Sequence, residues 1–78
     1  MGATNVSIEV TSVIEREGDG YVSLCPELSI ASQGETIEEA RRNLVEALEG
    51  FLLTASEAEV RDSLVAEVYV TRVRVGLA

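Results

Sequence analysis

Carboxylates are the side chains of this sequence that have the greatest capacity for chemistry. Fourteen aspartates and glutamates stand against six basic residues, all of them arginine. Histidine and lysine do not occur, which removes the commonest general base and zinc ligand, Schiff-base chemistry and the lysine of phosphate-binding loops. Two kinds of function are left to the acids: they hold Mg²⁺ in a nuclease site, or they bind a basic partner.

The nuclease alternative requires several inward-pointing acids that converge on one point. Only Glu9 and Glu67 fall inside expected strands and away from the strand ends. Strand alternation places Glu9 on the face opposite Val6, Ile8 and Val10, so it does not point toward the core. We therefore predict that the chain is not an enzyme and that it uses neither a metal nor a cofactor.

The net charge of −8 makes nucleic acid an unfavourable partner. An acidic body repels the phosphate backbone, and nonspecific binding depends on cationic contacts to it. Arg72 and Arg74 form the only local basic cluster outside the expected helix. We interpret them as solvated charges of an edge strand, and we predict no binding of nucleic acid by the chain on its own.

Other features of the composition bear on location. No apolar run approaches the length of about 18 residues that a membrane span requires. Residues 1–6 have neither the basic region nor the apolar region of a secretory signal. Cys25 is the only cysteine, so we interpret it as a small buried hydrophobe. Together these features predict a cytoplasmic protein with no membrane partner.

One long helix, predicted over residues 36–53, positions much of the charge. Thr36 and Glu39 have the spacing of a capping box, and Gly34 allows a sharp turn before the helix. Apolar residues then recur every three or four positions, which defines one buried stripe of a helix. This stripe consists of Ile37, Ala40, Leu44, Ala47, Leu48, Phe51 and Leu52. Such a stripe requires an apolar surface to cover.

That surface is predicted to be a sheet. Apolar and polar residues alternate along several short runs, Asp19-Gly20 is a hairpin signal, and Pro26 ends the second run. We predict a single α+β domain over residues 1–78 in the order β-β-β-α-β, in which an antiparallel meander carries the helix on one face. The four expected strands cover residues 5–15, 20–26, 28–32 and 64–75.

The stretch between the helix and the last strand, residues 54–63, is polar and contains no proline. Ser56 and Glu59 have the spacing of a second capping box. We predict a connector that contains one short extra helical turn.

The last expected strand is apolar on both faces. Val68 and Val70 lie on one face, and Tyr69, Val73 and Val75 lie on the other. The single helix covers only one face, so a second chain is expected to cover Tyr69, Val73 and Val75. A domain of 78 residues is also marginally stable alone. We predict a homo-oligomer, most simply a dimer.

Three short motifs occur in a characteristic order: Asp19-Gly20-Tyr21, Pro26-Glu27-Leu28, and Gly34-Glu35-Thr36-Ile37-Glu38-Glu39-Ala40. In this order and spacing, residues 5–55 resemble the HicB-like antitoxin family. The resemblance implies a β-β-β-α-β core likened to part of an RNase H fold. It also implies that the partner is a small, basic, RNA-cleaving toxin of the HicA type, which the antitoxin binds and neutralises.

The resemblance selects six candidate partner-binding residues: Asp19, Tyr21, Glu27, Glu35, Glu38 and Glu39. The alternative is that these acids are simply solvated and that the domain is a structural or oligomerisation unit without a toxin partner. Complete family members also carry a C-terminal DNA-binding module. No segment here is expected to form one, so repression of transcription is not predicted. The family's P-D-L-P-G-C motif is altered here to Pro26-Glu27-Leu28-Ser29-Ile30-Ala31.

Overall fold

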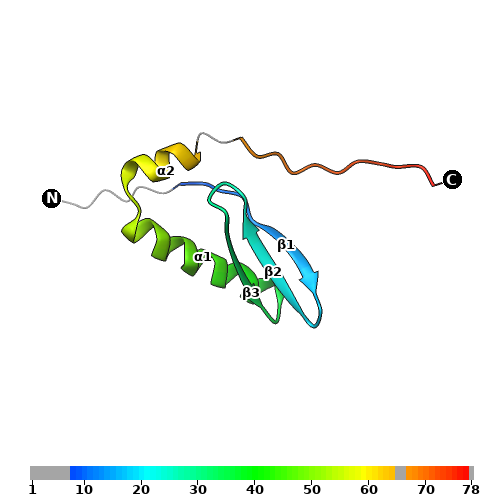
Figure 1. The fold of residues 1–78 in the computed structure, drawn as a ribbon. Helices are drawn as coiled ribbons and strands as arrows, with labels where there is room; N and C mark the ends of the chain where they lie inside the picture. The colour runs from blue at the N-terminus through cyan, green and yellow to red at the C-terminus, as the bar shows by residue number, and fades with distance from the viewer. Residues whose placement is uncertain (1–7, 65–66, 78) are drawn as a thin grey trace.

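A three-stranded antiparallel sheet with a long helix on one face forms the body of the protein (Figure 1). The structure is a computed structural model and describes residues 8–64 and 67–77. The elements are β1 (Val13–Glu17), β2 (Gly20–Cys25), β3 (Ile30–Gly34), α1 (Ile37–Thr54) and α2 (Glu57–Leu64). The strands lie in the order β1-β2-β3. The predicted α+β class and antiparallel meander are confirmed.

The hairpin between β1 and β2 is tight. Glu17 pairs with Gly20, so Gly18 and Asp19 are the two central residues of the turn. Gly18 has a φ of 58°, a left-handed conformation that glycine adopts without a steric penalty, while Asp19 does not. A glycine of positive φ at the first central position is typical of a type II′ turn. The hairpin is therefore as predicted, but its centre lies one residue before Asp19-Gly20.

The first and third strands begin later than predicted. The turn at residues 18–19 fixes the register, and Val13 pairs with Leu24 near the end of β2. Residues 8–12 have no ladder partner, because β2 ends at Cys25 and the chain then turns at Pro26. The expected strand over 5–15 is thus replaced by 13–17. Residues 8–12 form no strand, and residues 1–7 lie outside the described part of the chain.

The third strand is displaced in the same direction. The turn after β2 takes up residues 26–29, and the Ser29 backbone N–H donates to the Pro26 carbonyl at 3.3 Å. Cys25 then pairs with Ile30, so β3 covers residues 30–34 instead of the expected 28–32.

The two faces of the sheet have different environments. Ser23 and Cys25 point toward α1 and are fully buried, whereas Leu24 points to the other face and is 40% exposed. Leu44 and Leu48 of α1 pack with Cys25 to form the core, and Val10, Leu28 and Ile30 pack against its edge. The central part of the predicted helix stripe is therefore buried. Helix α1 lies mainly over β3, less over β2 and hardly over β1.

Both helices begin at the predicted caps. The Thr36 hydroxyl accepts from the Glu39 backbone N–H at 3.0 Å, and the Glu39 carboxylate accepts from the N–H of Glu35 instead of Thr36. At α2, Ser56 and Glu59 exchange two hydrogen bonds of 3.0 and 3.1 Å. The expected short turn is therefore an eight-residue helix.

The predicted last strand over 64–75 is not formed. Leu64 is the last residue of α2, and residues 67–77 have no regular secondary structure and no strand partner in the described structure; residues 65–66 lie outside it. Figure 1 shows 67–77 running out as an extended segment beyond the helices. A strand requires a hydrogen-bonded neighbour, and alternation alone does not supply one.

Within residues 8–64 and 67–77, neither helix combines the length and the apolarity that crossing a bilayer requires.

The burial of α1 leads to a prediction of stability. Leu44→Ala should reduce the free energy of unfolding by about 2 to 5 kcal/mol, because the side chain is 2% exposed and contacts the core. Thr36→Ala removes one capping hydrogen bond and should cost about 1 kcal/mol. Urea unfolding of the two variants measures the difference, and equal losses would show that the buried face is assigned wrongly.

Candidate functional site

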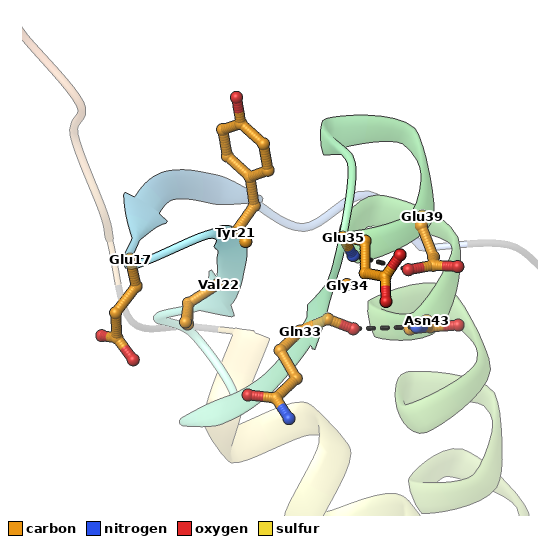
Figure 2. A pocket seen from close by; sticks show the side chains of 9 residues that line it. Glu17, Tyr21, Val22, Gln33, Gly34, Glu35, Glu39 and Asn43 are labelled. Carbon is orange, nitrogen blue, oxygen red and sulfur yellow. Dashed lines mark hydrogen bonds between the residues drawn. The ribbon is translucent and has the colours of Figure 1, made fainter.

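A shallow hollow of about 460 Å³ lies at the end of the sheet where the β1-β2 turn, the end of β3 and the start of α1 meet (Figure 2). Three of its side chains are carboxylates, one is an aromatic ring, and two are amides. The lining residues are Glu17, Gly20, Tyr21, Val22, Gln33, Gly34, Glu35, Glu39 and Asn43.

Two glycines allow the hollow to form. A Cβ at Gly34 would lie 2.5 Å from the backbone nitrogen of Ala40 and 2.8 Å from the carbonyl carbon of Glu39. A Cβ at Gly20 would lie 2.8 Å from the carbonyl oxygen of Gly34. Such distances are too short for any side chain, so β2, β3 and the first turn of α1 approach as closely as backbones can. The Asp19-Gly20-Tyr21 and Gly34-Glu35-Thr36 motifs are therefore packed against one another.

The helix side of the hollow is held by hydrogen bonds. The Asn43 side-chain N–H donates to the carbonyl of Gln33 at 2.8 Å, which ties the second turn of α1 to the end of β3. The Glu39 carboxylate accepts from the Glu35 N–H. Figure 2 shows the Glu35 and Glu39 carboxylates beside each other at the start of α1, with Glu17 across from them on β1. The Glu35 and Glu17 side chains are exposed and available to a partner.

Tyr21 is held by a residue that sequence reasoning missed. Arg16 Nη1 donates to the Tyr21 hydroxyl at 3.3 Å, and the guanidinium carbon lies 5.6 Å from the ring centroid, within the range of a cation–π contact. Arg16 is the direct cross-strand partner of Tyr21. The signal was present in the sequence, because a two-residue turn at Gly18-Asp19 places these residues opposite each other.

The structure brings together three of the six predicted partner-binding residues, Tyr21, Glu35 and Glu39, around the hollow. Asp19 in the β1-β2 turn and Glu38 in the first turn of α1 are exposed and lie outside its lining. Glu27 lies in the turn after β2, which is at the opposite end of the sheet. Glu27, the sixth predicted partner-binding residue, therefore lies away from the hollow.

Glu27 instead makes contacts within the chain. Both of its carboxylate oxygens accept from the Thr11 backbone N–H, at 3.0 and 2.9 Å, and one accepts from the Thr11 hydroxyl at 2.7 Å. Partial burial acts to raise the pKa of Glu27, but the hydrogen bonds from Thr11 and from its own backbone outweigh burial and leave the pKa below its usual value. Glu27 thus fastens the segment before β1 to the turn after β2.

The Cys25 thiol is buried beside this contact. Its Sγ lies 3.6 Å from a Glu27 oxygen. Burial, and then the neighbouring carboxylate, raise the pKa of Cys25 above its usual value. A buried thiol with a raised pKa is a poor nucleophile, which fits the expected packing role.

The acids considered for a nuclease site occupy other positions than expected. Glu9 and Glu67 both lie outside strands, and the Glu67 carboxylate accepts from the Tyr69 hydroxyl. In the part of the chain that the structure describes, no three Cys, Asp or Glu side chains are grouped so as to hold a metal ion.

Glu35 and Glu39 therefore offer carboxylates to a cationic group at the start of α1, while the Tyr21 ring and the Glu17 carboxylate point to opposite sides of the sheet (Figure 2). No protein-family model matches the chain, and neither a curated protein nor a solved structure matches it. The assignment of function depends on the geometry described above and on the motifs that meet in it.

The close approach at Gly34 can be tested by stability. Gly34→Ala should destabilise the protein by about 1 to 3 kcal/mol, because the new methyl group would overlap backbone atoms of α1. Gly50→Ala is the matched control: it lies within α1 with nothing near its Cβ position, and should stabilise the protein by about 0.5 to 1 kcal/mol. Thermal unfolding of both variants measures the difference. Equal stability of Gly34→Ala and Gly50→Ala would contradict the close packing at Gly34.

The Thr11–Glu27 contact predicts a dependence of stability on pH. The pKa of Glu27 is lower in the folded state than in the unfolded state. The ionised side chain therefore contributes fully to the free energy of unfolding above the unfolded-state pKa, and this contribution is lost as the pH falls through the folded-state pKa. Glu27→Gln should therefore be less stable than wild type at pH 7, and the difference should shrink between pH 5 and pH 3. Urea unfolding across this range measures the effect. Glu46→Gln, the same change at an exposed position of α1, is the control. A stability difference between wild type and Glu27→Gln that stays constant with pH would contradict the lowered pKa of Glu27.

Proposed function

We propose that this chain is a HicB-like protein-interaction module that binds and neutralises a small, basic, RNA-cleaving protein of the HicA type. One observation carries the proposal. Two motifs of the resemblance, Asp19-Gly20-Tyr21 and Gly34-Glu35-Thr36, lie apart in sequence but are in backbone contact, and together they surround an acidic hollow. Spacing in the sequence does not require this contact.

The chemistry of the hollow suits a cationic side chain. Glu17 and Glu35 are exposed carboxylates of its lining, and each would accept charge-assisted hydrogen bonds from a guanidinium or ammonium group of a partner. Tyr21 adds a rigid aromatic contact of the kind that contributes strongly to interfaces. The net charge of −8 would accelerate the approach of a basic partner and disfavour acidic ones.

Under this proposal the module acts in the cytoplasm by occupying the toxin and performs no catalysis itself. Glu38 and Asp19, which lie near the hollow but outside its lining, would contribute to the field that attracts the partner more than to direct contacts. Glu27 would contribute indirectly, by holding the opposite end of the sheet.

The test is to look for a short basic protein encoded by an adjacent reading frame and to measure whether this chain binds and neutralises it. Co-expression should prevent RNA cleavage, and the purified pair should elute as one complex in size-exclusion chromatography. Glu35→Arg should weaken the complex by about tenfold or more, since it places a cation against a cationic partner. The side chain of Glu35 makes no contact that the fold needs, so the variant should remain folded.

Glu46→Arg is the matched control, with the same change of charge on an exposed position of α1 outside the hollow. It should bind more tightly than Glu35→Arg. The proposal fails if no such protein is encoded nearby, if the pair forms no complex, or if both variants bind equally.

A further inference from the structure

Residues 67–77 have the pattern of a strand without a partner. Apolar and β-branched residues alternate with others along the segment. Tyr69, Val73 and Val75 are 77%, 82% and 74% exposed, and they share one face of an extended chain. Exposure of this much apolar surface on one extended segment typically marks an interaction site. The segment forms no strand with its own sheet (Figure 1).

Of the two edges of the sheet, the β1 edge is the more accessible to such a segment. At β3, Asn43 already donates to the Gln33 carbonyl, and α1 lies across the strand. At β1, the only pairing is with β2, and in residues 8–64 and 67–77 no hydrogen bond reaches its outer edge. A free edge of this kind accepts an added strand through backbone hydrogen bonds.

Charges match between the segment and this edge. Arg72 and Arg74 are two residues apart on one face of the segment, and Glu15 and Glu17 are two residues apart on one face of β1. Because the spacing is equal, each arginine can lie opposite one glutamate, whether the added strand runs parallel or antiparallel to β1. This register also places Val73 and Val75 on the Ile14 side of β1, which α1 hardly covers.

The distribution of charge in the whole chain favours the same contact. The segment 67–77 has one acid and two arginines, a net charge of +1, while the rest of the chain has thirteen acids and four arginines, a net charge of −9. Two acidic bodies therefore repel each other except where the segment of one meets the edge of the other.

We propose that residues 67–77 of one copy pair as a strand with the free edge of β1 in a second copy. The exchange is reciprocal, so a two-fold dimer contains two such pairings and leaves no segment unpartnered. It gives the segment the strand conformation that its sequence favours, and it places Val73 on the same sheet face as Ile14. The proposal concerns self-association and does not depend on the proposed toxin partner.

The experiment is sedimentation equilibrium of the full chain with exchanged charges. Wild type should have twice the chain mass of 8.4 kDa at tens of micromolar. Arg72→Glu/Arg74→Glu and Glu15→Arg/Glu17→Arg should each shift the equilibrium toward monomer, by about tenfold or more in the dissociation constant, because like charges then face each other. The chain with all four changes should recover the dimer.

Arg41→Glu/Arg42→Glu is the control, because it makes the same change of charge on α1, away from residues 67–77 and from β1. Arg61→Glu is a second control outside these two surfaces, and both controls should dimerise to the same extent. Circular dichroism establishes that each variant is folded. A monomeric wild type, or a dimer that the arginine reversals leave unchanged, would overturn the proposal. Failure of the four-change chain to recover the dimer while it remains folded would overturn the pairing of Arg72 and Arg74 with Glu15 and Glu17.

Discussion

The close packing of Gly34 against the first turn of α1 is the constraint on which the rest of the structure depends. Because no Cβ intervenes, the helix begins directly on the sheet, and Ala40 is fully buried there. The buried Ser23 hydroxyl then reaches the Ala40 carbonyl at 2.7 Å. This contact satisfies a polar group that would otherwise be costly to bury, and it fixes β2 beneath the helix. The hollow around Tyr21 lies where these backbones meet.

A core of this size leaves the edges of the domain to polar contacts. Cys25, Leu44 and Leu48 are the buried hydrophobic side chains that form its cluster. The Thr11–Glu27 hydrogen bonds bring the segment before β1 against this cluster, where Val10 covers its edge. A small apolar core with a buried hydroxyl and a partly buried carboxylate is stable only if each polar group is bonded, and each such group in the described residues is.

Local signals in the sequence were sufficient for α1, for its cap at Thr36 and for the existence of the first hairpin. Strand limits were not predictable in the same way, because the register of β1 depends on which residues of β2 lie opposite. The hollow was partly predictable, because the motifs named Tyr21 and Glu35. The contact between Arg16 and Tyr21 depends on the strand register, and the position of Glu27 away from the hollow depends on the length of β2. Alternation at residues 67–77 predicted a strand, yet a strand exists only with a hydrogen-bonded neighbour, and within residues 8–64 and 67–77 the segment pairs with none.

Glu17 connects the two proposed surfaces. It lines the hollow, and it also belongs to the β1 edge that would receive Arg72 and Arg74. An arginine of a second copy that pairs with Glu17 withdraws one carboxylate from a cationic partner in the hollow. By linkage, a partner bound in the hollow then weakens the strand pairing by the same factor. Glu35 lies on the α1 side and takes no part in this competition. The two surfaces therefore compete only through the Glu17 carboxylate, which belongs to both.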